Sequence, residues 1–296
     1  MKDNIDLIKL IQQNFAKLSK GQKLIAEYIM ENYDRAAFMT AAKLGEKVGV
    51  SESTVVRFAD TLGYDGYRDL QNELQEVIKN KLTTVQRISL VDNCSSKENL
   101  FEKVFKKDMS NINKTVDEID FDVFQDAVDK ILNSEKVYIL GLRSSSFLAG
   151  YLGFYLNFII ENVTVVTAGP NDIFEQLFKV TDKDVVIGIS YPRYSTRTLD
   201  ALNYVKEKGC KVIGITDSLI SPAARISDIT LLASSNMVSF VDSLVAPMSL
   251  INALVIAIGM KKGDDITKYF KDLEDIWKKH SVYNFTNKQN ENIRNK

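Results

Sequence analysis

Histidine, cysteine, tryptophan and proline are all scarce in this chain of 296 residues, which has one histidine, two cysteines, one tryptophan and four prolines. With one histidine, at His280, a single chain cannot build a histidine-based triad or a site that needs two histidine ligands. The two cysteines, Cys94 and Cys210, form no CxxC pair. We therefore expect no disulfide framework, no metal site and a reducing, cytoplasmic environment.

Excess charge and long apolar runs are also missing. The formal net charge is −1, so the whole chain gives no basic signal for nucleic acid. The most apolar stretch, Leu244 to Met260, is interrupted by Pro247, Ser249 and Asn252. It falls short of the roughly 20 residues that a membrane-spanning helix needs. We predict that it is a buried core helix and that the chain has no membrane partner.

The pattern of apolar residues changes along the chain and predicts four parts. Residues 1–79 are helical throughout, and residues 80–120 form a linker that is polar at first and then carries an amphipathic helix. Residues 121–262 alternate β-branched runs with helical patterns, and residues 263–296 form a C-terminal helix with a frayed tail. The linker helix should pack on the second domain or on a partner chain through a stripe of apolar side chains: Phe101, Phe105, Met109, Ile112, Val116 and Ile119.

Two short helices joined by a glycine-containing turn are predicted between residues 40 and 63. Thr40 and Ser51 are the expected N-caps, Gly49 breaks the first helix, and Gly63 ends the second. This arrangement is typical of a helix-turn-helix unit. The side chains expected to face inward are Ala42, Leu44 and Val48 in the first helix and Val55, Phe58, Ala59 and Leu62 in the second.

Short polar side chains near the start of the second helix suit base edges and phosphates in a DNA major groove. The alternative is an ordinary helical hairpin in a bundle. Residues 1–80 contain 11 basic and 12 acidic residues, so any DNA affinity must come from local placement. The residues predicted at the DNA are Ser53, Thr54 and Arg57 for bases and phosphates, Lys47 and Arg68 for backbone phosphates, and Ser51 mainly as the helix cap.

Five β-branched runs separated by helical patterns predict a doubly wound α/β domain with a five-stranded parallel sheet. The expected strands are residues 136–140, 163–167, 184–189, 211–216 and 229–233. In a flavodoxin-like strand order, the first and third strands are neighbours at the point where ligands bind.

The loops after the first and third strands are rich in hydroxyls, and each contains an arginine and leads into a helix N-terminus, where an anion is favoured. The sequence has no GxGxxG or GxxxxGK[ST] motif, so we expect no nucleotide cofactor and favour a small phosphorylated metabolite. The alternative is that Ser145 and Ser195 only cap helices. The predicted ligand contacts are Arg143, Ser144, Ser145, Ser190, Arg193, Ser195 and Thr198.

The stretch GVSESTVVRFADTLGYDGY, residues 49–67, resembles the signature GxSxSTVxRFxxxLGFxGF of the RpiR family of transcriptional regulators. Members of that family join an N-terminal helix-turn-helix domain to a SIS (sugar isomerase) domain, and the resemblance covers residues 1 to about 262. It implies a cytoplasmic bacterial regulator of carbohydrate genes that binds operator DNA as a homodimer or homotetramer. A phosphosugar at the SIS domain would modulate DNA binding.

The resemblance also implies roles for single residues. The family pattern GxGxS falls on Gly141, Arg143 and Ser145, and ISxSGxT starts at Ile189, so Ser145, Ser190 and Ser195 match as hydroxyl contacts. Thr198 matches a further threonine that is common in these regulators.

The chain departs from the family patterns at three positions, where Arg143 and Arg193 replace glycines and Pro192 replaces a serine. Our hypothesis is that the two arginines recognise a ligand that is more anionic than a hexose 6-phosphate, such as a sugar with a carboxylate or a second phosphate. The alternative is that one replaces the missing hydroxyl while the other pairs with Asp217 or Glu175.

An enzyme is the main rival to a regulator. A phosphosugar isomerase needs a base that moves a proton between adjacent carbons, and Glu161 and Glu175 are the conceivable bases. Because the only histidine lies outside the predicted sheet domain, we predict a regulator that is not an enzyme. A phosphosugar-binding scaffold without DNA binding is a third interpretation. The identity of the sugar, the operator sequence, and the choice between repressor and activator or dimer and tetramer stay open.

Overall fold

The computed structural model describes residues 7–81, 84, 87–88 and 99–283. Their contacts form two compact units. Unit 1 comprises Met1–Lys107, Tyr191–Tyr194 and Asn236–Ser243, and unit 2 comprises Asp108–Ser190, Ser195–Ser235 and Leu244–Lys296. Residues 284–296, the predicted frayed tail, lie outside the described residues, and so do 89–98 of the predicted linker.

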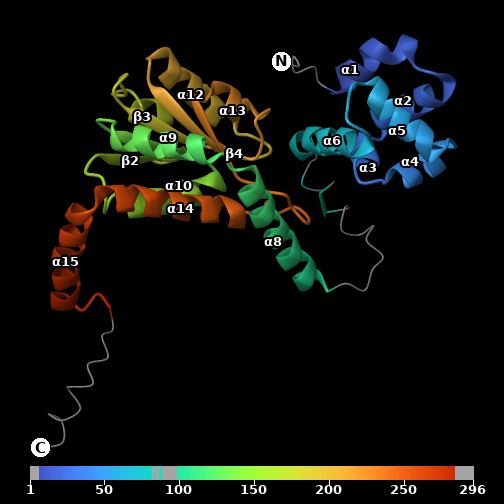
Figure 1. The fold of residues 1–296 in the computed structure, drawn as a ribbon. Coiled ribbons are helices and arrows are strands. Elements are labelled where there is room, and N and C mark those ends of the chain that lie inside the picture. Colours follow the sequence, from blue (N-terminus) through green and yellow to red (C-terminus); the bar gives the residue numbers. More distant parts are fainter. Residues whose placement is uncertain (1–6, 82–83, 85–86, 89–98, 284–296) are drawn as a thin grey trace, which may run out of the picture. The chain divides into compact units, whose positions relative to one another are not determined.

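Unit 1 begins with a bundle of helices (Figure 1). The helices are α1 (Leu7–Asn14), the 3-10 helix η1 (Phe15–Lys17), α2 (Lys20–Glu31), α3 (Tyr33–Ala36), α4 (Ala41–Val48), α5 (Glu52–Thr61) and α6 (Tyr67–Lys81). Ser19 starts α2 with a capping box, in which the Gln22 N–H donates to Ser19 Oγ and the Ser19 N–H donates to Gln22 Oε1. Local sequence signals therefore fix where this helix begins.

The core of unit 1 collects one apolar face from each main helix. Ile25, Leu44, Phe58 and Leu70 have no exposed surface. Tyr67 closes the end of this core, where its hydroxyl donates to the Met39 carbonyl at 2.8 Å, and burial raises the pKa of this phenol to about 12. The bundle thus has its own core, which holds α4 and α5 in place.

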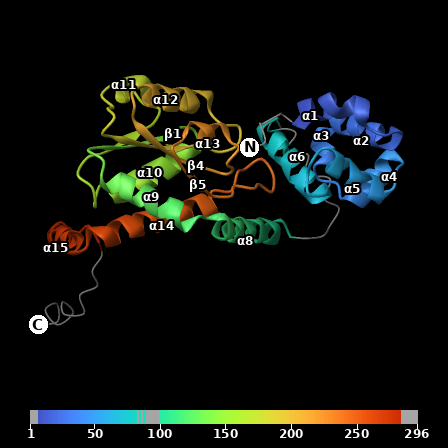
Figure 2. The same ribbon diagram turned by 45° about the horizontal axis from the view of Figure 1, so that its top comes forward.

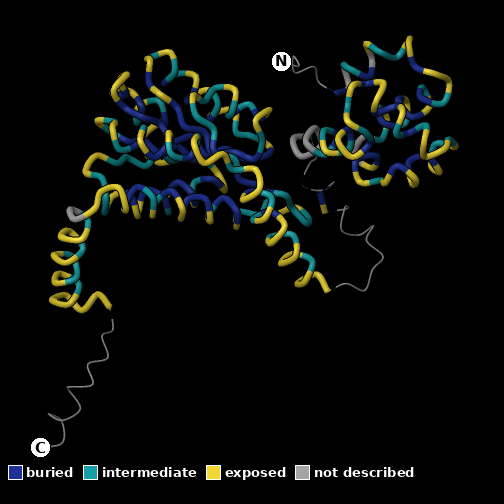
Figure 3. Tube along the Cα trace, viewed as in Figure 1, coloured by how far each residue is buried: buried dark blue, intermediate teal, exposed yellow. Residues whose placement is uncertain are grey.

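Helix α8 (Leu100–Glu118) is exposed or half-buried along most of its length (Figure 3), and its two buried residues are polar. Asn111 and Thr115 are buried, Ser234 Oγ lies 3.1 Å from Asn111 Oδ1, and the Ser234 N–H donates to Thr115 Oγ1 at 2.9 Å. Four members of the predicted apolar stripe are more than half exposed in this single chain: Phe101, Phe105, Met109 and Val116. The expected packing on the second domain is not seen for these four, and the expected packing on a partner chain stays a prediction. The side of α8 that anchors it to unit 2 is therefore not the side that its hydrophobic pattern indicates.

Unit 2 contains a five-stranded sheet in which all strands are parallel and the order is β2-β1-β3-β4-β5. This confirms the predicted doubly wound fold and its flavodoxin-like order. The strands are β1 (Val137–Gly141), β2 (Val163–Val166), β3 (Val185–Ile189), β4 (Lys211–Thr216) and β5 (Ile229–Leu232). The three central strands are buried except for Lys211, as expected for a parallel sheet with helices on both faces.

Helices cover both faces of this sheet (Figure 2). One face carries α9 (Phe121–Leu132), α10 (Ser145–Leu156) and α14 (Val245–Lys262), and the other carries α11 (Ile173–Gln176), α12 (Thr196–Glu207) and α13 (Pro222–Ile226). Helix α15 (Asp264–Lys279) follows α14 and lies beyond the sheet (Figure 1).

Cys210 belongs to the core between the sheet and α12. Its thiol is 1% exposed and donates to the Asp184 carbonyl at 3.3 Å. Burial, followed by the charges of Asp184 and Asp228, raises the pKa of this thiol to about 12. Cys210 is therefore a core residue and not a reactive thiol.

Helix α14 corrects the prediction of a buried core helix. Its inner face, including Leu250, Leu254 and Ile258, is buried, but Ile256 and Met260 on its outer face are exposed. In the described part of the chain, α14 is the one helix long and apolar enough to cross a membrane, a test that core helices of soluble proteins also pass. The apolar pattern reflects packing on one side and an uncovered surface on the other.

Candidate functional site

Helices α4 and α5 form the predicted helix-turn-helix. Thr40 caps α4 by accepting from the Lys43 N–H at 3.2 Å, and Gly49 ends it with a left-handed φ of 78°. Ser51 occupies the N-cap of α5, and Gly63, with φ of 87°, follows its C-cap. The predicted boundaries are confirmed, because each depends on a residue with a strong local preference.

One predicted inward residue of α4 is wrong. Ala42 is exposed, and the buried positions are Ala41, Leu44 and Gly45. Positions 41, 44, 45 and 48 follow the helical repeat, whereas position 42 lies on the opposite side. The predicted inner face of α5 is confirmed, since Val55, Phe58, Ala59 and Leu62 are all buried.

Gly45 allows the turn between α4 and α5 to pack closely against α4. A Cβ atom at this position would lie 2.7 Å from the Val50 carbonyl oxygen and 3.3 Å from the Glu52 nitrogen. Only glycine therefore allows the turn to pass this close to the helix. The sequence prediction did not single out Gly45, although a glycine inside a short helix is a recognisable signal.

Gln22 of α2 fixes the orientation of α5. Its Nε2 donates to the Arg57 carbonyl at 3.2 Å and to Thr61 Oγ1 at 2.8 Å, and Thr61 Oγ1 donates to the same carbonyl at 2.7 Å. These bonds lie on the inner side of α5 and leave its opposite side exposed. These contacts of Gln22 with α5 were not predicted from the sequence, because the partners are 35 and 39 residues away.

The predicted base-reading residues gather at the N-terminus of α5. Ser51 Oγ lies 2.9 Å from Ser53 Oγ and 2.8 Å from Thr54 Oγ1, and Arg57 Nε donates to the Ser53 carbonyl at 3.3 Å. Ser51, Ser53 and Arg57 are exposed and Thr54 is half-buried. The prediction that the Ser51 side chain caps the helix is wrong, because it makes no cap hydrogen bond.

The remaining two predicted DNA contacts lie on neighbouring helices. Lys47 is exposed in the last turn of α4, and Arg68 is exposed in the first turn of α6. The arrangement offers hydroxyl groups and one guanidinium on an exposed helix start, with further cations on the helices before and after it. Such a surface can contact phosphates and base edges.

The two predicted ligand loops leave the sheet from neighbouring strands. Gly141 at the end of β1 pairs with Ile189 at the end of β3, so Ser144 and Ser190 follow from adjacent strand ends. Ser190 is buried, and its N–H donates to the Ile215 carbonyl of β4 at 3.1 Å. Helices α10 and α12 begin directly after these loops, which places their free N–H groups at the same edge.

Of the two serines that could act as helix caps, one does cap a helix. Ser195 is the N-cap of α12, and its Oγ accepts from the Thr198 N–H at 3.4 Å. Ser145 is not a cap: it is the first residue of α10, it is buried, and the N-cap position belongs to Ser144. Thr198 is also buried. The hydroxyl of Ser145 is thus not explained by helix capping.

Arg143 and Arg193 have the same unusual backbone conformation. Their φ angles are 56° and 61°, and they stand at the two positions where the resembling family has glycine. A left-handed conformation costs a side-chain-bearing residue about 1–2 kcal/mol. The loops after β1 and β3 therefore have the left-handed backbone that glycine favours, although an arginine occupies that position in each loop.

One of the two acidic partners suggested for the loop arginines is engaged elsewhere. Within unit 1, Arg193 Nη1 donates to Thr84 Oγ1 at 3.0 Å. Glu175, one suggested partner, accepts from the Asp172 N–H at 3.1 Å in the capping box of α11. Asp172 in turn pairs with Arg197 of α12. The suggested pairing of an arginine with Glu175 is therefore replaced by a local helix cap.

A third polar cluster was not predicted. At the end of β4, next to β3, Thr216 Oγ1 lies 3.0 Å from Ser221 Oγ and 3.3 Å from Asp217 Oδ1, and all three side chains are buried. The sequence signal was the polar run Thr216-Asp217-Ser218 directly after a β-branched strand. A ligand at this edge of the sheet would meet these groups as well.

Neither suggested catalytic base has a matching position. Glu161 precedes β2 and so lies at the N-terminal edge of the sheet, whereas the ligand loops lie at the C-terminal edge. Glu175 is held in its capping box. Among the described residues, no group of three or more His, Cys, Asp or Glu side chains is placed to hold a metal ion.

Comparisons with known proteins cover both units. The model of the helix-turn-helix domain, rpiR family, matches residues 5–81, and the SIS domain model matches residues 130–257. An uncharacterized HTH-type transcriptional regulator of Clostridium perfringens is 27% identical over 220 residues, which are 74% of this chain and 78% of that protein.

Two solved structures are similar to this one. The sugar isomerase domain of an RpiR transcription factor from Sphaerobacter thermophilus is 29% identical, with a TM-score of 0.58, and the match covers 60% of this chain and 99% of that domain. The Vibrio vulnificus NanR protein, solved in complex with ManNAc-6P, has a TM-score of 0.58 at 17% identity, over 94% of this chain and all of that protein. At 17% identity the likeness to NanR shows a shared fold.

Proposed function

The chain belongs to the RpiR family of transcriptional regulators, which join a helix-turn-helix to a SIS domain, and from this premise we propose that a phosphorylated sugar bound at the SIS domain tunes operator binding. The observation that carries the proposal is the pair of hydroxyl- and arginine-bearing loops at the adjacent ends of β1 and β3, in a chain that also has an exposed helix-turn-helix. The protein would act in the cytoplasm, as a homodimer or homotetramer, on genes of carbohydrate metabolism.

The DNA-binding part of the proposal rests on α5. Ser53, Thr54 and Arg57 are the residues that would reach base edges and phosphates, with Ser51 beside them. Lys47 and Arg68 would contact backbone phosphates. The hydroxyl cluster and the exposure of Lys47, Ser51, Ser53, Arg57 and Arg68 support these roles.

The ligand-binding part rests on the two loops. Ser144, Ser145, Ser190, Ser195 and Thr198 would supply hydroxyls and N–H groups to a phosphate at the starts of α10 and α12. The nearness of the strand ends and the buried, non-capping position of Ser145 support this assignment.

Arg143 and Arg193 would give the site its preference for a second anionic group. Guanidinium groups bind carboxylates and phosphates bidentately. The retention of left-handed φ angles at both arginines supports the proposal, since such backbone strain concentrates at functional positions.

Arg193 also suggests how the two activities are coupled. Its hydrogen bond to Thr84 connects the loop after β3 to the segment that follows α6. A ligand anion that binds Arg193 would compete with this hydrogen bond. The ligand would then favour an arrangement in which Thr84 is released, which is the differential affinity that any effector needs.

The experiment that tests the proposed function is a pull-down of sheared genomic DNA with the purified protein at near-physiological salt, followed by sequencing. A few enriched sites with a shared palindrome are the expected result, and the genes beside them would nominate the sugar. Binding that is uniform across the genome and lost with added salt would contradict a sequence-specific regulator.

The proposed binding of a phosphosugar at the SIS domain is tested by a separate measurement. Candidate phosphosugars from the nominated pathway are titrated into the protein by calorimetry, and the best ligand is then tested against Arg143→Ala and Arg193→Ala. We expect each variant to lose about tenfold or more in affinity, as for a charge-assisted hydrogen bond. Unchanged affinity in both would remove the arginines from the site, and turnover of a phosphosugar would favour an enzyme.

A further inference from the structure

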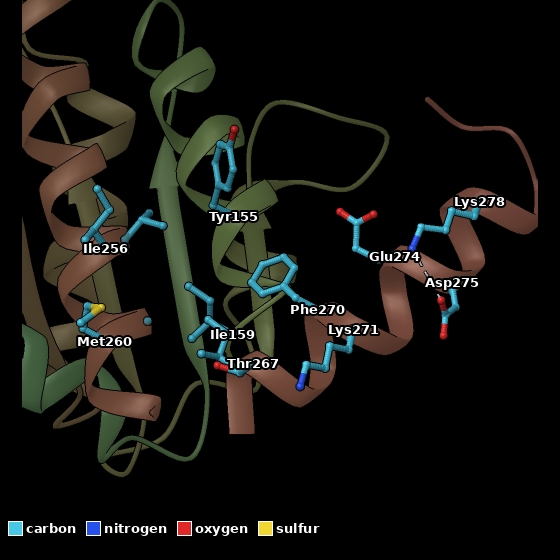
Figure 4. Close-up of a pocket in the computed structure, with 13 residues that line it drawn as sticks. Tyr155, Ile159, Ile256, Met260, Thr267, Phe270, Lys271, Glu274, Asp275 and Lys278 are labelled. Atoms are coloured by element: carbon cyan, nitrogen blue, oxygen red, sulfur yellow. Dashed lines mark ion pairs between the residues drawn. The ribbon is translucent and has the colours of Figure 1, made fainter. Parts of the chain in front are cut away.

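The apolar groove on the outer side of unit 2 does not belong to the ligand edge of the sheet. It has a volume of about 910 Å³ and lies between α10, α14 and α15, with Tyr155, Ile256 and Phe270 among its lining residues (Figure 4). Tyr155 lies in the last turn of α10, which runs back from the end of β1 towards the start of β2. Groups that recognise the sugar must instead lie at the carboxyl ends of the strands, where ligands of such sheets bind.

The carboxyl ends of β4 and β5 continue this edge beyond the two loops of the proposed phosphate site. Ile189 of β3 pairs with Ile215 of β4, and Thr216 of β4 pairs with Leu232 of β5. Neighbouring strands lie about 4.8 Å apart, so the ends of β4 and β5 are about 5 and 10 Å from the end of β3. A sugar that extends to this side from a phosphate at the start of α12 therefore meets β4 first and then β5.

The end of β4 presents a buried cluster of oxygen atoms. Thr216 Oγ1 lies 3.0 Å from Ser221 Oγ and 3.3 Å from Asp217 Oδ1. Ser221 also caps α13, where its Oγ accepts from the Ala224 N–H at 3.0 Å. Asp217 adds a carboxyl group, which accepts several hydrogen bonds when it is ionised. A sugar hydroxyl is a suitable donor to such a group.

The end of β5 presents a buried hydroxyl. Ser235 is 3% exposed, and its Oγ makes no hydrogen bond with any of the residues that the structure describes. Buried polar groups in folded proteins normally have a hydrogen-bond partner, so an exception calls for an explanation. Ser145 and Ser190 of the proposed phosphate site are buried to a similar degree, at 5% and 3% exposed. A ligand that binds at this edge would supply the partner of Ser235.

Ser234, the residue before Ser235, has a different role. Its N–H donates to Thr115 Oγ1 at 2.9 Å, and its Oγ lies 3.1 Å from Asn111 Oδ1, so it ties the end of β5 to α8. The two adjacent serines therefore contact different things, since Ser234 bonds to α8 and Ser235 does not. A ligand held by Ser235 would act on the residue next to the anchor of α8.

On the opposite side of the proposed site, beyond β1, the polar side chains serve the local fold. Asp172 pairs with Arg197, and Glu175 accepts from the Asp172 N–H in the capping box of α11. Gln176 Nε2 donates to the Thr167 carbonyl at 3.0 Å. These engagements favour the β4 side for the sugar.

We propose that Asp217 and Ser235 form a subsite that recognises the hydroxyl groups of the sugar, on the β4–β5 side of its phosphate. This inference rests on the proposed function, because it takes the phosphate to be bound at the starts of α10 and α12. An ionised carboxylate accepts from sugar hydroxyls and repels a second phosphate or carboxylate. The hydroxyl-bearing carbons would then face Asp217 and Ser235, and any second anionic group would face Arg143 and Arg193.

The test compares inorganic phosphate with four phosphosugars: glucose 6-phosphate, fructose 6-phosphate, N-acetylglucosamine 6-phosphate and 6-phosphogluconate. Each is titrated by calorimetry into the full chain and into its variants, and the readout is the affinity of the phosphosugar divided by that of phosphate. For the phosphosugar that the parent binds best, Ser235→Ala and Asp217→Asn should each lower this ratio about fivefold or more, as for one lost hydrogen bond. The affinity for phosphate alone should stay the same.

The stability of the unligated protein gives Ser235→Ala a second readout. Because Ser235 Oγ has no hydrogen bond among the described residues, its removal should leave the urea midpoint unchanged or raise it. Ser234→Ala removes the hydroxyl next to Asn111 Oδ1 and should lower the midpoint. A loss of stability in Ser235→Ala as large as that in Ser234→Ala would show that Ser235 is structural and would overturn its assignment.

Two control variants separate a failure of the subsite from a failure of the proposed function. Ser145→Ala, in the proposed phosphate site, should weaken phosphate and phosphosugar alike and so leave the ratio unchanged. Ser227→Ala should change neither affinity, because Ser227 precedes β5 at the opposite edge of the sheet and its Oγ donates to the Ala223 carbonyl at 2.8 Å.

The possible failures have different outcomes. If the parent binds none of the four phosphosugars more tightly than phosphate, the proposed effector and the subsite are both wrong. If the parent binds one of them more tightly, and both Ser235→Ala and Asp217→Asn keep the full ratio while Ser145→Ala loses affinity, the proposed phosphate site stands and the subsite alone is wrong.

Discussion

The residues that we propose for DNA binding lie in unit 1, whereas those that we propose for ligand binding, except Arg193, lie in unit 2. Substitutions can therefore test the two binding activities separately. The exposed guanidinium of Arg57 lies on the helix that would enter DNA, while Arg143 lies at the end of β1 in the other unit. Changes at these positions should therefore affect one activity each.

Arg57→Ala should weaken operator binding by about 1–3 kcal/mol, which is roughly a 5- to 150-fold loss in affinity. The side chain projects from the exposed side of α5, so the fold should be retained. Binding is measured by fluorescence anisotropy on a labelled operator at several salt concentrations. Arg35→Ala in α3 removes the same charge from another exposed position and serves as the control; equal losses in both variants would indicate a general charge effect.

Substitutions of Arg143 can measure the free energy that its left-handed backbone conformation costs the folded protein. Because its φ is 56°, Arg143→Gly should be more stable than Arg143→Ala by about 1 kcal/mol. Glycine and alanine substitutions at the exposed Asn203, in the middle of α12, should show the opposite order, since glycine is about 1 kcal/mol worse than alanine within a helix. Urea unfolding of the four variants checks this, and alanine more stable than glycine at position 143 would disprove the strain.

At the scale of elements, the contact between α4 and the turn before α5 depends on Gly45. Gly45→Ala should destabilise unit 1 by about 1–3 kcal/mol, because the new Cβ would lie 2.7 Å from the Val50 carbonyl oxygen. The gain in helix propensity offsets only part of this cost. Thermal unfolding followed by circular dichroism measures the change, and the exposed Glu46→Ala in the same helix is the control. Equal stability of the two variants would show that the turn moves at little cost.

The connection between β4 and α12 depends on Asp228. Although burial opposes ionisation, hydrogen bonds from Lys206, the Val212 N–H and Lys211 lower the pKa of this carboxyl to about 2. A lowered pKa means that the stabilisation is complete above the ordinary value of 3.8 and is lost as the pH falls through about 2.

Asp228→Asn should therefore destabilise unit 2 by about 1–2 kcal/mol at pH 7, and the difference from the parent should shrink between pH 4 and pH 2. Urea unfolding at a series of pH values provides the measurement. Asp200→Asn, at an exposed position of α12, should show no such dependence. A difference that stays constant with pH would mean that Asp228 acts by packing alone.

The elements and their order could be predicted from the sequence, whereas several side-chain contacts could not. β-Branched runs between helical patterns are enough to specify the parallel sheet and its neighbours β1 and β3. Ser51 and Ser145 were placed correctly at helix starts, but whether their hydroxyls bond to the backbone depends on local angles that a sequence does not encode. The stripe on α8 was recognised correctly as apolar, yet the buried polar contacts of Asn111 and Thr115 involve residues more than 100 positions away.

At the scale of the whole molecule, the effector and the operator must influence each other equally. If the sugar changes operator affinity by some factor, bound operator must change sugar affinity by the same factor, with typical values of about 5 to 150. Calorimetric titration of the sugar with and without operator DNA measures the change in sugar affinity. Fluorescence anisotropy of a labelled operator with and without sugar measures the change in operator affinity.

Thr84→Val should reduce this factor, because it removes the acceptor of the Arg193 hydrogen bond while leaving the loop hydroxyls intact. Ser89→Ala, a little further along the chain, is a control of similar size. A coupling factor that is the same in the parent and in Thr84→Val would show that the connection runs elsewhere.

The inert thiol of Cys210 has a practical use. A thiol that is 1% exposed and whose pKa is raised by burial to about 12 reacts with an alkylating reagent only when the segment around Cys210 opens. In a Cys94→Ser background, the rate of modification would report how often unit 2 opens under native conditions. Ligand and DNA could then be compared by how far each slows the modification of Cys210.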